Sequence, residues 1–64
     1  MPRFVVGDRV RQRDDWNVVG IVLRVVSESY EPKGYYPEYE ISFDCPDGPP
    51  SVEIESEFDL ARVR

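Results

Sequence analysis

The groups in this chain that could do chemistry are carboxylates, guanidinium groups and a few aromatic rings. The 64 residues include 13 acidic and eight basic residues, one cysteine and no histidine. Imidazole catalysis and histidine metal sites are therefore excluded, and Cys45 alone permits neither an internal disulfide nor a multi-cysteine zinc site. Charge and aromatic recognition remain, so we expect a binding protein and not an enzyme, with no cofactor and no metal.

Glutamates alternate with apolar residues in two neighbouring segments, 38–43 and 52–55. The turn Cys45-Pro46-Asp47-Gly48 between them has Pro and Gly at the positions that a type I turn favours, which predicts a hairpin. Period-two alternation would place the apolar side chains inward, Val52 and Ile54 among them.

The carboxylates of this hairpin would then share one outward face, which consists of Glu38, Glu40, Glu53 and Glu55. Directly opposed like charges destabilise a sheet by about 0.2–1 kcal/mol per pair. An acidic face kept at that cost predicts docking on a basic protein surface, either of the transcription machinery or of a DNA-binding regulator. The simpler interpretation, in which these glutamates only solubilise the sheet and protect its edge, stays open.

Seven of the eight cations are arginine. Residues 3–13 alternate, with an interruption at Gly7-Asp8, and predict a strand with one apolar face and one arginine face. Pairing of the first strand with the last would gather a basic face of Arg9, Arg11, Arg13, Arg62 and Arg64. Weak nucleic-acid binding through that face is an alternative function, although the net charge of −5 disfavours it.

Three aromatic residues fall in two predicted loops and form a third candidate site: Trp16, Tyr35 and Tyr36. If they converge at one end of the molecule, they could hold a methylated lysine or arginine by cation–π attraction, or an extended peptide in an aromatic groove. Capping of the core explains the same residues without a ligand.

The elements that position these groups are predicted to be short strands. Residues 18–26 form a β-branched run that is apolar on both sides, which is typical of a bent central strand serving two sheets. Residues 27–37 contain two prolines and one glycine and favour a loop. A single helical turn opens at Ser56, and residues 60–63 form a final strand.

This pattern predicts an all-β fold, a small five-stranded SH3-like barrel with a single 3₁₀ turn before the last strand, and residues 1–64 as one domain. A competing prediction comes from Ile54, Phe58 and Ala61, which also fit one face of a helix. That alternative would give a three-stranded sheet with a C-terminal helix.

Several motifs of the chain resemble those of known small barrels. They are Gly7-Asp8-Arg9-Val10, Gly20-Ile21-Val22, Tyr39-Glu40-Ile41-Ser42-Phe43, Val52-Glu53-Ile54 and residues 60–63. The pattern is similar to that of Tudor-like and KOW-like barrels, including the RNA-polymerase-interacting domain of the CarD and transcription-repair-coupling-factor family. The resemblance implies an accessory or regulatory factor in a bacterial or phage setting.

Composition narrows the class of partner. The excess of acidic residues predicts a protein partner with a basic surface. The sequence has no run of 18 apolar residues and no basic leader, so we predict neither a membrane span nor a signal peptide and expect a cytoplasmic location. We predict a non-enzymatic protein-interaction module. A structural homo-oligomer that associates through Val5 and the outer valines of the second strand is the alternative, with the monomer favoured and the oligomeric state left open.

Overall fold

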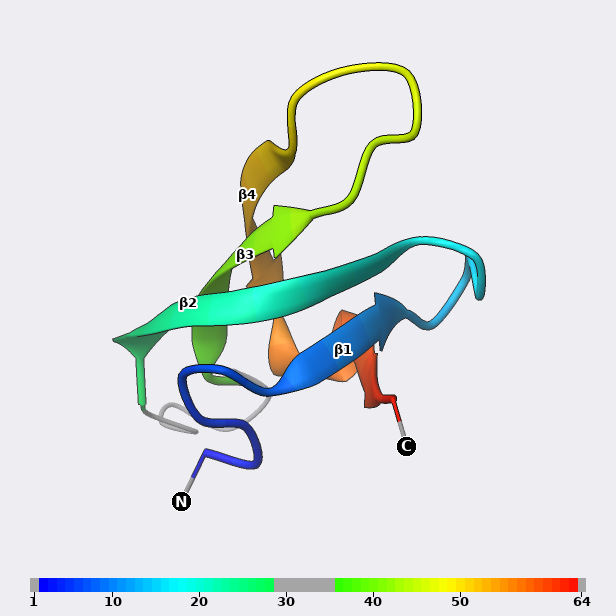
Figure 1. Cartoon of the computed structure of the whole chain (residues 1–64). Coiled ribbons are helices and arrows are strands. Elements are labelled where there is room, and N and C mark those ends of the chain that lie inside the picture. The colour runs from blue at the N-terminus through cyan, green and yellow to red at the C-terminus, as the bar shows by residue number, and fades with distance from the viewer. Residues whose placement is uncertain (1, 29–35, 64) are drawn as a thin grey trace.

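The computed structural model describes residues 2–28 and 36–63 of the chain. Its elements are β1 (Arg9–Gln12), β2 (Val19–Ser27), β3 (Glu38–Phe43), β4 (Ser51–Ser56), the 3₁₀ turn η1 (Glu57–Asp59) and β5 (Leu60–Arg62) (Figure 1). All neighbouring strands are antiparallel, in the order β4-β3-β2-β1-β5. The all-β class, the pairing of the first strand with the last and the 3₁₀ turn before the last strand are confirmed. The alternative of a C-terminal helix is wrong.

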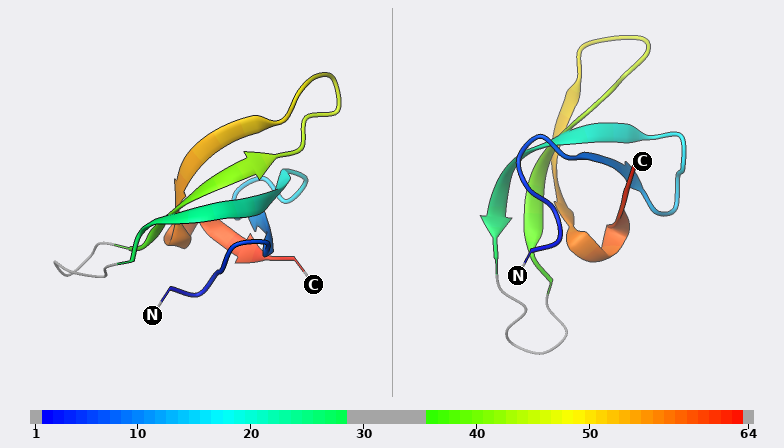
Figure 2. Two further views of the ribbon diagram at one scale, coloured as in Figure 1. Left: turned by 60° about the vertical axis from the view of Figure 1, so that its left-hand side comes forward. Right: turned by 60° about the horizontal axis from the view of Figure 1, so that its bottom comes forward.

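The long strand β2 bends the sheet. It pairs with β1 near its start and with β3 along its length, and its register shifts between Val22 and Arg24 and again between Val25 and Ser27. Such irregularities add twist and bend a strand, and the sheet curls accordingly (Figure 2). Among the described residues no ladder joins β4 to β5, so the sheet is curved but is not a closed barrel.

The hydrophobic core lies against the inner side of this curved sheet. Its buried members are Phe4, Val10, Val22, Tyr39, Ile41, Phe43 and Leu60. Strand β4 contributes none of them, because its first four residues are exposed and its last two are only partly buried. Figure 1 shows the β3–β4 hairpin projecting beyond the other strands.

The register of β3 and β4 reverses the predicted sides of β4. Glu53 lies opposite Ile41 and Glu55 lies opposite Tyr39, while Ile54 lies opposite Glu40. Directly opposed residues of an antiparallel pair point to the same face. Ile41 and Tyr39 are buried, so Glu53 and Glu55 are on the inner face and Ile54 is on the outer face.

Two predictions about the hairpin are therefore wrong. Val52 and Ile54 point outward, and the four glutamates Glu38, Glu40, Glu53 and Glu55 do not share a face. Only Tyr39, Ile41 and Phe43 of β3 point inward as predicted.

The physical reason lies one residue beyond β4, at Glu57. This side chain is 3% exposed, and its Oε1 accepts hydrogen bonds from the Tyr39 hydroxyl at 2.6 Å and from the Arg3 backbone N–H at 2.8 Å. The Glu57 N–H donates to the Pro37 carbonyl at 2.8 Å. With residue 57 held inside, residues 55 and 53 follow on the same face, since a slip by one residue would reverse the whole strand.

Candidate functional site

Strand β4 lies at one end of the sheet. In the parts of the chain that the structure describes, β4 pairs with β3 alone, so its other edge is open along Ser51–Ser56. Val52 is 57% exposed and Ile54 is 46% exposed, and both lie on the outer face. An open edge that carries apolar side chains is a template for pairing with another chain.

The outer face of the sheet carries both apolar and polar side chains. Ile21, Ser42 and Val52 lie opposite one another in a row from β2 to β4, and Ile21 is 46% exposed. Arg24, Glu40 and Ile54 form the next row, in which Arg24 Nε lies 3.3 Å from Glu40 Oε1. A cation and a carboxylate thus neutralise each other here, so the outer face is not the purely acidic face that the sequence predicts.

The inner side of β4 carries negative charge. Glu53 Oε2 accepts a hydrogen bond from Ser51 Oγ at 2.9 Å, and Glu55 Oε1 accepts one from Gln12 Nε2 at 3.2 Å. Burial raises the pKa of Glu55, and the neighbouring charges of Glu53, Asp59 and Asp14 raise it further, while the Gln12 hydrogen bond lowers it. We call Glu53 and Glu55 the inner carboxylates of β4.

The raised pKa of Glu55 predicts a pH-dependent difference between the wild-type chain and Glu55→Gln. A raised folded-state pKa favours the protonated form, so the contribution of Glu55 is fully present below its unfolded pKa and is lost as pH rises through the folded pKa. In urea unfolding, the free energy of unfolding of Glu55→Gln should therefore rise relative to that of the wild-type chain as pH rises from 4 to 7. Asp47→Asn, in the exposed hairpin loop, is the control. A gain in the opposite direction would contradict this account of Glu55.

The predicted basic face is not one surface. Arg9 and Arg11 flank the buried Val10 on β1 and so point to the opposite face, whereas Arg62 lies directly opposite Val10. Arg62 is held by its neighbours: Nη1 lies 3.0 Å from Asp8 Oδ2, and Nη2 donates to the Arg3 carbonyl at 2.6 Å. The pairing of β1 with β5 brings the arginines into one region but divides them between two sides.

The other two residues of the predicted basic face are Arg13 and Arg64. Arg13 follows β1, and its Cζ lies 5.8 Å from the centre of the Phe58 ring. Arg64 lies outside the described residues.

The predicted aromatic site does not form from Trp16 and Tyr36. Trp16 lies in the β1–β2 connection, whereas Tyr36 lies just before β3, and these places are at opposite ends of β2 (Figures 1 and 2). The chain's own Arg11 covers the Trp16 ring, with Cζ 4.5 Å from its centre. Tyr36 instead packs against Phe58, with 5.4 Å between ring centres. Tyr35 lies outside the described residues.

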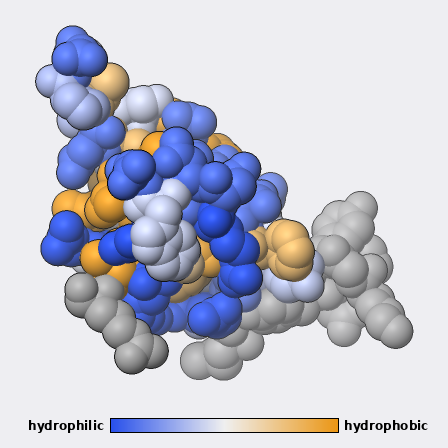
Figure 3. Space-filling view, turned by 90° about the vertical axis from the view of Figure 1, so that its right-hand side faces the viewer, coloured by the Kyte–Doolittle hydropathy of each residue, from blue (hydrophilic) through white to orange (hydrophobic). Residues whose placement is uncertain are grey.

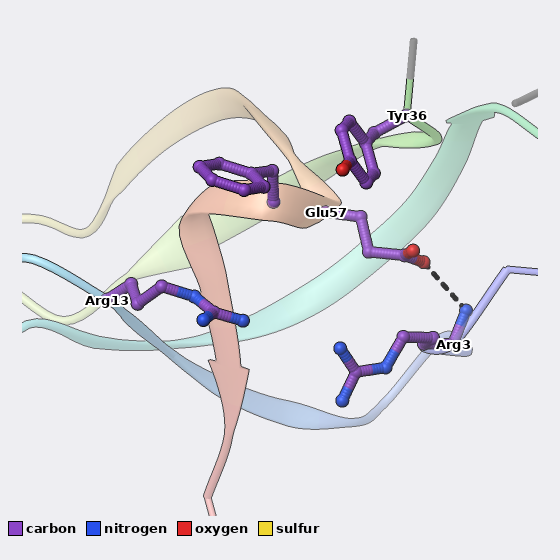
Figure 4. Close-up of a pocket in the computed structure, with 5 residues that line it drawn as sticks. Arg3, Arg13, Tyr36 and Glu57 are labelled. Atoms are coloured by element: carbon purple, nitrogen blue, oxygen red, sulfur yellow. Dashed lines mark hydrogen bonds between the residues drawn. The ribbon is translucent and has the colours of Figure 1, made fainter. Parts of the chain in front are cut away.

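A pocket of about 220 Å³ opens beside η1 (Figure 4). Its lining consists of Arg3, Arg13, Tyr36, Glu57 and Phe58. Sequence reasoning missed the buried Glu57, because a glutamate after a Ser cap gives no signal of burial. The hydrogen bonds to its Oε1 tie the N-terminal segment and β3 to η1, so we assign this carboxylate a structural role.

Metal ligands, membrane-spanning helices and the single cysteine are the other features that could indicate a function. Within residues 2–28 and 36–63, no group of three His, Cys, Asp or Glu side chains could hold a metal ion, and no helix is long and apolar enough to cross a membrane. Cys45 is an exposed free thiol. The side of the molecule with the β1–β2 and β3–β4 connections is mostly hydrophilic, and its apolar side chains are in separate spots (Figure 3).

The chain matches no protein-family model, no curated protein and no solved structure.

Proposed function

We propose that this chain is a protein-interaction module that binds an extended segment of a partner protein as an additional strand on the outer edge of β4. The observation that carries the proposal is the open β4 edge with Val52 and Ile54 exposed beside it. Strand addition uses backbone hydrogen bonds for affinity and alternate side chains for specificity. It needs no enzymatic group.

Strand β4 is better suited to this role than β5, which is also at the edge of the sheet. The six residues of β4 span about 20 Å at roughly 3.4 Å per residue, a usual strand length. Strand β5 has three residues, and the Arg62 side chain there is already held by Asp8 and by the Arg3 carbonyl. The projecting hairpin also leaves both faces of the first four β4 residues exposed.

We propose further that the fold is of the SH3-like type and that the module is an accessory or regulatory factor of transcription in the cytoplasm. The strand order and the 3₁₀ turn before β5 support the first part. The second part rests on the resemblance of the motifs to polymerase-interacting barrels.

A photo-crosslinking amino acid at Val52 tests the proposed binding edge. Val52 is exposed on the outer face, so the residue should be tolerated, and we expect one adduct of defined mass in the cells that make this protein. Mass spectrometry identifies the partner and the segment attached. Adding Ile54→Asp should reduce the adduct several-fold, because a buried charge at the contact is costly.

The matched control carries the same crosslinker at Val5, which is 61% exposed and lies outside the sheet. A heterologous adduct from Val5 with none from Val52 would overturn the proposal. Attachment of a second copy of the chain at Val5 would favour the homo-oligomer instead.

A further inference from the structure

We infer that the partner segment alternates cationic and apolar residues, so that Lys or Arg lies against the inner carboxylates of β4 and apolar side chains lie beside Val52 and Ile54. The inference rests on the proposed addition of a strand to β4. It names the chemistry of the partner, which strand addition alone does not specify.

The two sides of β4 differ in character along the same open edge. Val52 and Ile54 are exposed on the outer face, whereas Glu53 and Glu55 lie on the inner face. Successive side chains of an added strand also point to alternate faces, and each lies beside the β4 side chain on its own face. A segment with apolar residues at one parity and cations at the other therefore matches both sides at once.

Other carboxylates add to the negative charge that Glu53 and Glu55 give to the inner side of β4. Glu55 interacts electrostatically with Glu53, Asp59 and Asp14, and it accepts a hydrogen bond from the neutral side chain of Gln12. A cation placed beside Glu55 therefore meets carboxylates from β4, from η1 and from the β1–β2 connection.

A second copy of the chain fits this edge poorly. In the two longest pairings of two β4 strands about a two-fold axis with matched faces, Glu53 lies opposite either Glu53 or Glu55 of the other copy. Directly opposed carboxylates repel. The same glutamates that select a basic partner thus oppose self-pairing along β4.

Three synthetic peptides with acetylated and amidated ends test the inference against the full 64-residue chain. The first peptide alternates Val with Arg, and the second alternates Val with Glu. The third has the same composition as the first, but all its Val residues precede all its Arg residues. Binding is measured by amide shifts in NMR titrations at low and moderate salt. We expect the alternating Val–Arg peptide to bind at least about tenfold more tightly than either other peptide and to shift β4 amides most.

Charge reversal provides the matched variants. Glu53→Lys/Glu55→Lys should reverse the preference and bind the Val–Glu peptide more tightly. Asp44→Lys/Asp47→Lys changes the net charge by the same amount in the exposed hairpin loop and should keep the original preference. An equal loss of Val–Arg binding in both variants would show non-specific attraction and overturn the inference.

The outcomes separate this inference from the proposed function. If peptides of either charge shift β4 amides equally, strand addition stands and the cationic alternation is wrong. If no peptide shifts β4 amides, the cationic alternation is also rejected, and the crosslink from Val52 decides strand addition separately. Concentration-dependent dimerisation through β4 in sedimentation at neutral pH would identify a second copy as the occupant and contradict the inference.

Discussion

Replacing Gly20 with alanine is expected to lower the free energy of unfolding by about 2–4 kcal/mol. A Cβ on Gly20 would lie 2.6 Å from the Ser42 carbonyl oxygen, 2.7 Å from Ile41 Cγ2 and 2.9 Å from Phe43 Cδ1. The first contact is with the backbone of β3, which cannot rotate away, and the other two are with buried core side chains. The β2–β3 pairing must therefore shift to admit one methyl group.

Thermal unfolding followed by circular dichroism measures this effect. A loss of 1 kcal/mol lowers the Tm of a domain of this size by roughly 4–8 °C, so a loss of 2–4 kcal/mol should lower it by about 8–32 °C. Gly48→Ala is the matched control, because a Cβ there meets nothing within 4 Å. Equal Tm values for the two alanine variants would show that the close approach of β2 to β3 at Gly20 is not a constraint.

Tyr39→Phe is expected to cost about 2 kcal/mol without changing the fold, because the ring stays and only the hydroxyl is lost. That hydroxyl donates to Glu57 Oε1 at 2.6 Å and accepts from the Phe4 N–H at 3.3 Å. Its removal takes one donor from a carboxylate that is 3% exposed and leaves the buried Phe4 N–H without this acceptor.

Urea unfolding of Tyr39→Phe, Glu57→Gln and the double variant tests whether these groups act together. We expect the cost of the double variant to be smaller than the sum of the single costs by about 1 kcal/mol or more, as for residues in one hydrogen-bond network. Additive costs would contradict the account of Glu57 as the anchor of β4.

The Tyr39 hydroxyl also predicts that the stability of the fold falls at alkaline pH. Burial and the hydrogen bond to Glu57 raise the pKa of Tyr39 from 10.0 to about 12. A raised folded-state pKa contributes stability that is present below pH 10 and is lost as pH rises through about 12, by roughly 2–3 kcal/mol. Tyr39→Phe should lack this part of the alkaline loss. An identical loss in both proteins would contradict it.

Much of the fold could be predicted from local pattern. Segment 38–43 alternates cleanly and forms β3 within the same bounds, and the N–H of Gly48 donates to the Cys45 carbonyl at 3.4 Å in the predicted turn. Ser56 Oγ accepts from the Phe58 N–H at 3.2 Å, as predicted for a capped turn. Each of these features depends on residues close in sequence, which is why pattern sufficed.

The sides of β4 could not be predicted in this way. Alternation in Val52-Glu53-Ile54-Glu55 favours apolar residues inside, and that rule fails because the hairpin projects beyond the other strands and leaves the first four residues of β4 exposed. The deciding contact is the burial of Glu57 against Tyr39, which is 18 residues away in sequence. A buried carboxylate has no local signature.

The predicted acidic face is wrong for the same reason. The four-glutamate face required one assumed parity, and the reversed parity exchanges an acidic face for an edge that is apolar outside and acidic inside. The sequence predicts loops at both Trp16 and Tyr36, but the nine residues of β2 separate these two loops. Loop residues can be assigned to one end of a sheet only after the strand directions are known.

Backbone amide hydrogen exchange of the chain, free and bound to the partner captured from Val52, tests strand addition to β4 most directly. An added strand forms hydrogen bonds with the outward-pointing amides of Ser51–Ser56, so exchange at alternate β4 positions should slow at least about tenfold while exchange in β5 stays unchanged. Unchanged exchange throughout β4, with protection at β5 or around the pocket beside η1, would contradict the proposal.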